Sequence, residues 1–253
     1  MKNDINSPLL QNIISYPKFN ESQYYERINE LVSLGVEEII LTGPTKIFNL
    51  NILGKGHSGV VVKVNTKNGN NLALKIRRID SNRKNLNNEA KFMIMANSLN
   101  IGPRLIDSKK NLILMELIEG QKILSWLENK VSVHSFKNRK LTRQVLKDIM
   151  EQCYLLDNMY LDHGELTRID NHVLISENKA SILDFESSSV NRKTTNVTSI
   201  TQSLIFNGII AEKVRDILAL STARYEILEH LKKYKKAQNR ENFNKIISSI
   251  LGC

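Results

Sequence analysis

The chain carries a glycine-rich stretch that decides its fold, Gly54-Lys55-Gly56-His57-Ser58-Gly59-Val60-Val61. This stretch has the pattern G-x-G-x-x-G-x-V and joins two apolar runs, 47–53 and 60–64, that are typical of strands. Glycines in such a turn let the backbone bend tightly and approach phosphate oxygens with no Cβ in the way. A dinucleotide-binding fold is disfavoured, because a strand rather than a helix comes after the last glycine. An isolated match is more often a simple turn, so the residues beyond it must decide its meaning.

A lysine and a glutamate follow the glycine-rich stretch at informative positions. Lys75 lies in an otherwise apolar predicted strand, 71–76, and the hairpin signal Asn68-Gly69-Asn70 precedes that strand. Pairing of consecutive strands then brings the lysine beneath the glycine-rich turn. Glu89 lies beside the apolar stripe of a predicted helix, 82–100, and a carboxylate buried there needs a cationic partner, for which Lys75 is the candidate. The alternatives are a lysine on the wet face of the strand and a solvated glutamate on the helix. The stripe consists of Leu86, Ala90, Met93 and Ile94, and Gly102-Pro103 ends the helix.

The remaining patterns divide the chain into three parts. Residues 1–45 are predicted to form an N-terminal extension of one helix and a short strand, residues 46–118 a part rich in strands, and residues 119–253 a helical part. The patterns predict a helix that ends at Gly35 and carries Tyr24, Ile28, Leu31 and Val32 at helical spacing, strands at 38–41, 105–106 and 112–118, and a helix over 142–160 with Val145, Ile149, Cys153 and Leu156 on one face.

Two acidic motifs lie in the helical part. Leu161-Asp162-His163-Gly164-Glu165-Leu166 comes directly after the predicted helix 142–160. Further on, Ser181-Ile182-Leu183-Asp184-Phe185-Glu186 is typical of a short strand that ends in an exposed acid. The order is therefore glycine-rich turn, strand lysine, helix glutamate, and two acidic loops, and five ordered elements are much more specific than any one of them.

This ordered set resembles the protein-kinase superfamily over about residues 47–206. Within the superfamily, the chain is most similar to the RIO-like predicted serine/threonine kinases of archaea. The resemblance implies an α+β, bilobal protein-kinase-like fold with a β-rich N-terminal lobe, 46–118, and a reduced helical C-terminal lobe, 119–253. The motifs that carry it are His163-Gly164-Glu165-Leu166, His172-Val173-Leu174-Ile175, Asp184-Phe185-Glu186-Ser187 and Asn196-Val197-Thr198.

The resemblance implies ATP and Mg²⁺ as cofactors and assigns roles to individual residues. Lys75, held by Glu89, would contact the nucleotide phosphates, and Asp184 would bind the Mg²⁺ ion that bridges them. Glu165 stands where such kinases have the aspartate that orients the acceptor hydroxyl. The catalytic residues would be Glu165, Lys75 and Asp184. The nucleotide-binding residues would be Gly54, Gly56, Gly59, Val61, Lys75 and Glu89, with Met115, Glu116 and Leu117 at the hinge edge facing the adenine.

The chain departs from the family pattern at four places. Glutamate replaces aspartate at Glu165, and Glu186 replaces a glycine that often supplies backbone freedom beside the metal ligand. The usual asparagine is replaced by Asp170, so the second metal ligand is ambiguous; hard oxygen ligands suit Mg²⁺, which ranks Asp170 before Asn171 and His172. The segment 187–195 is short and lacks an Ala-Pro-Glu sequence after it, so an extended activation segment is not expected.

The resemblance leaves two classes of function open. In the first, the chain is an ATP-dependent phosphotransferase, either a serine/threonine protein kinase with a protein acceptor or an ATPase switch. In the second, it is a pseudokinase that binds nucleotide without turnover; a small-molecule kinase is a third interpretation.

Composition adds an expectation about partners and location. The 36 basic and 26 acidic residues give a net charge of +10, which favours polyanionic partners. The two cysteines predict neither a disulfide framework nor a zinc site, and the polar N-terminus and the lack of a long apolar run favour a cytoplasmic protein without a membrane partner. An RNA partner is one interpretation of the cluster Lys232, Lys233, Lys235, Lys236 and Arg240; a solvated helix face is the other.

Overall fold

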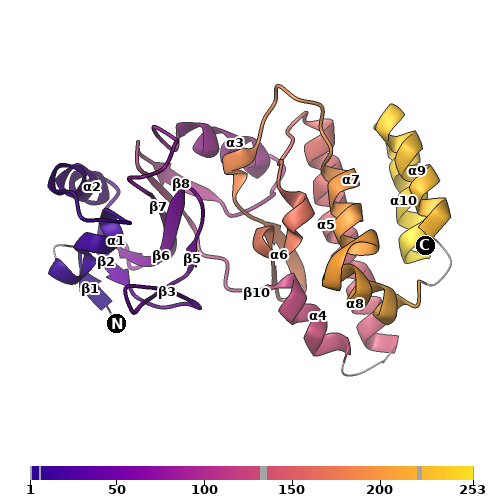
Figure 1. Cartoon of the computed structure of the whole chain (residues 1–253), viewed down its shortest axis with the longest axis horizontal. Coiled ribbons are helices and arrows are strands. Elements are labelled where there is room, and N and C mark those ends of the chain that lie inside the picture. Colours follow the sequence, from indigo (N-terminus) through magenta and orange to yellow (C-terminus); the bar gives the residue numbers. More distant parts are fainter. Residues whose placement is uncertain (1, 6, 132–135, 221–223, 253) are drawn as a thin grey trace. The chain divides into compact units, whose positions relative to one another are not determined.

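The computed structural model describes residues 2–5, 7–131, 136–220 and 224–252. It is a mixed α/β protein whose chain divides into two compact units. The N-terminal unit contains residues 1–97 and 103–118, and the C-terminal unit contains residues 98–102 and 119–253 (Figure 1).

An antiparallel sheet forms the centre of the N-terminal unit. Its strand order is β1-β2-β6-β7-β9-β8, and β5 pairs with β6 beside this path. The strands are β1 (Lys2–Asp4), β2 (Val36–Ile40), β5 (Gly54–Lys55), β6 (Gly59–Thr66), β7 (Asn71–Arg77), β8 (Leu105–Ser108) and β9 (Leu112–Glu116). The predicted hairpin between β6 and β7 is confirmed, and Gly69, with φ +73°, supplies the left-handed residue in its turn.

The single strand predicted over 47–53 is wrong. The chain forms a separate hairpin there, β3 (Thr45–Ile47) paired with β4 (Leu50–Ile52). Its two loop residues, Phe48 and Asn49, have φ of 48° and 62°. Two successive residues with positive φ make the turn whose twist matches that of paired strands, and asparagine tolerates this conformation. Phe48 is apolar and gives no turn signal in the sequence, so the turn was not predicted.

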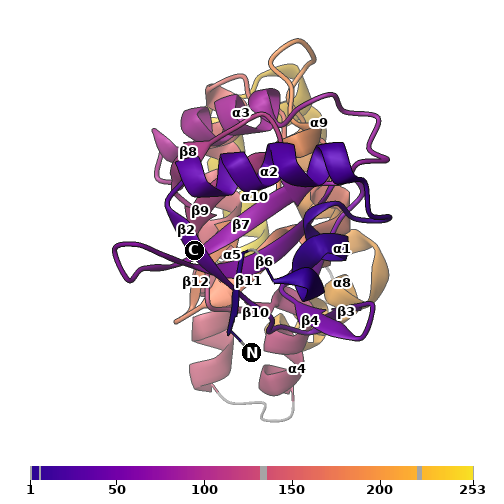
Figure 2. The same ribbon diagram turned by 90° about the vertical axis from the view of Figure 1, so that its left-hand side faces the viewer.

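Helices cover the sheet of the N-terminal unit. They are η1 (Pro8–Leu10), α1 (Gln11–Ile14), α2 (Glu21–Ser33) and α3 (Asn87–Asn97). Helix α2 begins where Asn20 Oδ1 accepts a hydrogen bond from Gln23 N, and it packs against β2 and β9 (Figure 2). Leu10, Ile13, Ile14 and Leu31 are buried in one core with sheet residues such as Val62 and Val64, so residues 1–45 contribute to this unit's interior.

Two apolar residues lie outside the buried helix faces on which the spacing places them. Val32 is 54% exposed, while Arg27 takes a place on the buried face of α2. Ile94 is 59% exposed, although Ala90 and Met93 of the same helix are buried as predicted. One residue along a helix turns a side chain by about 100°, so Val32 and Ile94, each adjacent to a buried residue, point elsewhere.

The C-terminal unit is built around the long helix α5 (Phe136–Asn158). Val145, Ile149, Cys153 and Leu156 are fully buried, as the helical spacing predicts. α5 packs against β12, α7, α8 and α10. A small antiparallel sheet has the order β10-β11-β12, from Gln121–Lys122, Val173–Ser176 and Lys179–Ile182. The helices are α4 (Ile123–Val131), η2 (Leu166–Arg168), α6 (Ile169–His172), η3 (Phe185–Ser187), α7 (Asn196–Thr201), the π-helical turn η4 (Gln202–Phe206), α8 (Gly208–Leu218), α9 (Arg224–Lys236) and α10 (Arg240–Leu251).

Among the described helices, none combines the length and the apolar composition needed to cross a membrane.

Candidate active site

The glycine-rich stretch forms a tight turn between β5 and β6. Gly56 N donates a hydrogen bond of 2.8 Å to Gly59 O, which closes the turn. A Cβ on Gly54 would meet no atom within 4 Å, and one on Gly56 would meet only Gly59 O at 3.7 Å. The first two glycines therefore leave room above the backbone, as a phosphate-binding turn requires.

Lys75 and Glu89 form the predicted ion pair. Lys75 lies on β7 opposite Val61 of β6, and its Nζ is 2.7 Å from Glu89 Oε1. Only 4% of Lys75 and 5% of Glu89 are exposed. Glu89 lies in the first turn of α3, where a carboxylate is favoured by the helix dipole. Both charges are buried, and their attraction offsets part of the cost of removing them from water.

Gly59 has a role that the sequence pattern does not reveal. A Cβ on Gly59 would lie 3.0 Å from Lys75 Cε, 3.1 Å from Lys75 Cγ and 3.0 Å from Ile76 O. The aliphatic part of the lysine therefore runs directly over Gly59. The third glycine of the motif is the one that makes room for the lysine.

We expect Gly59→Ala to displace the Lys75 side chain from Glu89 and to lower the free energy of unfolding by about 1–3 kcal/mol, the usual cost of overpacking. Gly54→Ala is the matched control, since its Cβ meets open space, and should change stability by less than about 0.5 kcal/mol. Urea denaturation of both variants measures the difference. Equal stability losses would show that Gly59 does not accommodate the lysine.

The residues predicted to face the adenine lie at the end of β9. Met115 pairs with Ala73 and Leu105 in the sheet and is half-buried, like Val61 and Leu117. Glu116 is exposed, and its carboxylate accepts a hydrogen bond of 3.1 Å from Arg104 N. The side chain of Glu116 therefore fixes the start of β8.

A buried aspartate anchors the loop that follows α5. Asp157 is 2% exposed, and its carboxylate accepts hydrogen bonds from Asn196 N, Asn196 Nδ2, Val197 N and Tyr234 Oη at 2.9–3.2 Å. Burial raises the pKa of Asp157, and these hydrogen bonds oppose that rise. Asn196 in turn donates to Leu161 O and accepts from His163 N, both at 2.8 Å. The start of α7 and the first acidic loop are thereby tied to one carboxylate.

The next acid of that loop, Asp162, holds Arg192. Arg192 Nε bonds the Asp162 carboxylate, and Thr195 N donates to the same carboxylate at 2.7 Å. The arginine then crosses Gly164, whose φ is +90° and whose Cβ would overlap Arg192 Nη2 at 2.2 Å. Glycine is needed at position 164 for both reasons.

His163 is a neutral structural residue. It is fully buried, and its Nε2 lies 2.9 Å from Leu183 O, a carbonyl that can only accept, so Nε2 carries the proton. Its Nδ1 accepts from Glu165 N at 3.4 Å. Burial is the largest cause that lowers the pKa of His163 to about 4. The histidine is therefore neutral at pH 7 and connects the two acidic loops.

Glu165, His172 and Asp184 converge within the C-terminal unit. One donor atom from each side chain lies within 4.8 Å of the others, and His172 Nε2 is 3.2 Å from Glu165 Oε2. Asp184 has φ +66° and ψ +78°, a left-handed conformation that costs a non-glycine residue about 1–3 kcal/mol. Strain of this kind gathers at functional sites.

Asp170 lies outside this group. Its carboxylate accepts a hydrogen bond of 3.1 Å from Leu124 N in the first turn of α4, and Lys122 Nζ is 3.5 Å away. Asp170, ranked first from the sequence as the second metal ligand, thus caps a helix. Asn171, ranked second, is exposed and lies 3.4 Å from Lys122 Nζ.

Comparison with known proteins gives one relative and no family model. No protein-family model matches the chain. The uncharacterized protein MJ1211 of Methanocaldococcus jannaschii is 30% identical to it over 123 residues, which are 48% of this chain and 99% of the archaeal protein. The chain belongs to the same family as MJ1211. The match with MJ1211 shows common descent and brings no activity with it.

Sequence reasoning missed several residues that shape the candidate site. The role of Asp157 was not predicted because this residue continues a helical pattern. The role of Arg192 was not predicted because this residue lies in a segment without periodicity. The sequence gives one indication that Asn196 matters for the site: it belongs to the motif Asn196-Val197-Thr198.

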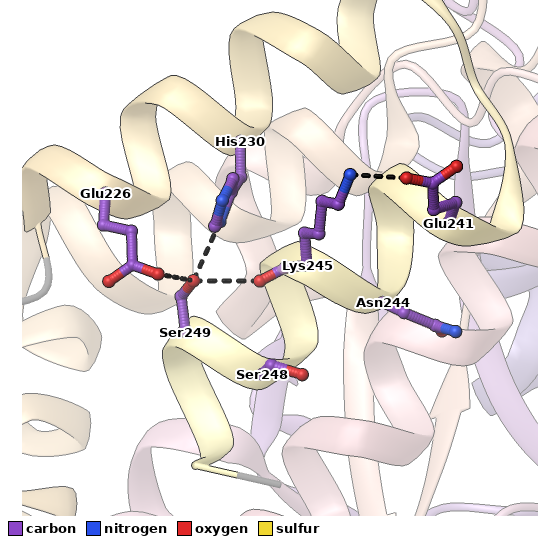
Figure 3. A pocket seen from close by; sticks show the side chains of 7 residues that line it. All are labelled: Glu226, His230, Glu241, Asn244, Lys245, Ser248 and Ser249. Atoms are coloured by element: carbon purple, nitrogen blue, oxygen red, sulfur yellow. Dashed lines mark hydrogen bonds and ion pairs between the residues drawn. The ribbon is translucent and has the colours of Figure 1, made fainter.

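A separate pocket lies between α9 and α10 and contains none of the predicted site residues (Figure 3). Ser249 Oγ lies 2.8 Å from His230 Nδ1, 2.9 Å from Lys245 O and 3.1 Å from Glu226 Oε1. The contacts of Ser249 with His230 and Glu226 join the two helices, and the contact with Lys245 O lies within α10. The pocket is lined by Glu226, His230, Glu241, Asn244, Lys245, Ser248 and Ser249.

The basic cluster of the C-terminal helices is partly neutralised. Arg240 Nη1 bonds both carboxylate oxygens of Glu151, and its guanidinium lies 4.2 Å from the centre of the Tyr154 ring. Lys232 pairs with Glu229 at 2.6 Å. The cluster lysines at 232, 233, 235 and 236 are exposed.

Proposed function

We propose that the chain is an ATP-dependent phosphotransferase of the protein-kinase superfamily, a RIO-like serine/threonine kinase or an ATPase switch. The observation that carries the proposal is the buried Lys75–Glu89 pair beside the glycine turn. A buried ion pair is weak evidence for stability, because a hydrophobic replacement is often as stable. The lysine is held beside a turn that has room for phosphate, so it can serve as a phosphate ligand.

Phosphoryl transfer requires mostly positioning and neutralisation of charge. In the proposed mechanism, the backbone of the glycine turn and the Lys75 ammonium contact the phosphates, and Glu89 keeps that ammonium in place. Asp184 would hold a divalent cation, which would supply neutralisation of charge on the phosphates. Glu165 orients the attacking hydroxyl or water. Its side chain is one methylene longer than that of aspartate, and a different backbone position accommodates the extra length.

The structure of the first acidic loop supports this assignment. The connection through Asp157, Asn196 and His163 fixes the backbone that leads into Gly164, so Glu165 is presented from a rigid segment. Rigid presentation of the acid is what general-base or orienting roles need.

The exposed lysines of α9 are the surface expected to meet an RNA partner, if the acceptor is a ribonucleoprotein.

The test compares ATP binding with phosphate release and transfer. Glu165→Gln removes a charge with almost no change of size, so nucleotide affinity should survive while turnover falls by about 10²-fold. Glu177→Gln is the matched control, because Glu177 is an exposed glutamate in the turn between β11 and β12. Calorimetric titration measures binding, and γ-labelled ATP measures release and transfer.

The outcomes separate the alternatives. A wild-type chain that fails to bind ATP contradicts the proposal as a whole. Binding of ATP with no turnover in the wild type favours a pseudokinase, and transfer to a small molecule but not to protein favours a small-molecule kinase.

A further inference from the structure

The Glu165, His172 and Asp184 side chains come from three separate segments of the C-terminal unit. Glu165 precedes η2, His172 ends α6, and Asp184 follows β12. Their donor atoms lie within 4.8 Å of one another. Metal–ligand bonds of ~2.0–2.2 Å place donor atoms at most about 4.4 Å apart. Small side-chain rotations therefore suffice to bring all three onto one ion.

His172 is an unusual member of this group for a site that holds Mg²⁺. It is 5% exposed, and its Nε2 faces the Glu165 carboxylate at 3.2 Å. Among the described residues, no group makes a hydrogen bond to its Nδ1. A buried imidazole with a single carboxylate as its partner is costly to keep, since burying an unpaired polar atom costs about 1–3 kcal/mol. The imidazole nitrogen that faces the Glu165 carboxylate is Nε2, and Nε2 is the donor atom that the ring offers to an ion at this cluster.

The ligand types decide which ions fit. Mg²⁺ takes oxygen ligands and retains several waters, so a buried imidazole nitrogen is a poor partner for it. Imidazole suits first-row transition metals, and carboxylates suit Mn²⁺ as well as Mg²⁺. Two carboxylates and one imidazole thus favour an ion that accepts both kinds of ligand.

We propose that Glu165, His172 and Asp184 form a binding site for a divalent transition metal, represented by Mn²⁺, in preference to Mg²⁺. Asp184 was expected to hold Mg²⁺ with Asp170; here His172 takes the second position and changes the preferred ion. The inference refines the cation of the proposed phosphotransferase, but the site stands on its own ligands and its test contains no nucleotide.

The experiment uses the full chain, freed of metal with a chelator, and titrates Mn²⁺ and Mg²⁺ separately. We expect one Mn²⁺ per chain, bound at least ~10-fold more tightly than Mg²⁺. Pulsed electron paramagnetic resonance of the bound Mn²⁺ should show coupling to a directly bonded ¹⁴N nucleus. His172→Asn should remove that coupling and lower Mn²⁺ affinity at least ~10-fold.

His230→Asn is the matched control, because His230 bonds Ser249 and is not part of the cluster. This variant should retain both the affinity and the ¹⁴N coupling. Mg²⁺ affinity equal to that of Mn²⁺, or Mn²⁺ bound without ¹⁴N coupling in the wild type, overturns the inference even if His172→Asn does not fold. A Mn²⁺ site in a chain that neither binds nor hydrolyses ATP would contradict the phosphotransferase proposal and leave the metal site in place.

Discussion

Replacing Lys75 by methionine is expected to lower the free energy of unfolding by about 3–5 kcal/mol, because the Glu89 carboxylate then stays buried without its cation. The ammonium and the carboxylate are 2.7 Å apart and both are almost fully buried. The sequence alone predicts that Lys75→Ala weakens ATP binding far more than the fold. The burial of the pair changes this expectation, since both losses should occur in a single variant.

A double variant separates the two roles. Lys75→Met with Glu89→Leu removes both charges and fills the space with apolar atoms, so it should recover most of the lost stability. ATP binding should remain lost, since the phosphate ligand is gone. Urea denaturation and calorimetric titration of ATP give the two quantities. Recovery of stability together with ATP affinity would show that the pair is merely structural.

Sequence reasoning succeeds in the N-terminal unit where local signals agree. The hairpin at 68–70 brings β6 and β7 together, and this local pairing is what places Lys75 beside Gly59. Glu89 could be anticipated because helical spacing directs it toward the sheet. The β3–β4 hairpin could not, because its turn depends on the backbone conformation of Phe48, a residue with no turn preference.

In the candidate site, the choice of a second metal ligand depends on the direction in which each residue of α6 points. Asp170 and His172 lie two positions apart on α6, and two helical residues at that spacing differ in direction by about 200°. When Asp170 faces Leu124 at the start of α4, His172 must point toward Glu165. From the sequence, ligand chemistry ranks Asp170 before His172 as the second Mg²⁺ ligand, whereas in the structure it is His172 that faces Glu165. The sequence does not show which side of so short a helix faces the acid, because four residues define no apolar face.

Replacing Asp157 by alanine is expected to lower the free energy of unfolding by about 3–5 kcal/mol, through the buried donors that lose their acceptor. The substitution leaves Asn196 N, Val197 N and Tyr234 Oη without the acceptor that now satisfies them. Each buried donor without an acceptor costs about 1–3 kcal/mol, and relaxation of the start of α7 limits the sum.

Amide hydrogen exchange should show which parts of the structure are destabilised by the loss of Asp157. The amides of Val197 and His163 should exchange with solvent faster in the variant, the first directly and the second because Asn196 loses its orientation. Tyr234→Phe is the graded control: it removes one of the hydrogen bonds to the carboxylate and should cost about 1 kcal/mol. If Asp157→Ala costs no more than Tyr234→Phe and leaves His163 protected, the carboxylate does not hold the acidic loop, and Glu165 must be positioned by Asp162 and Arg192 instead.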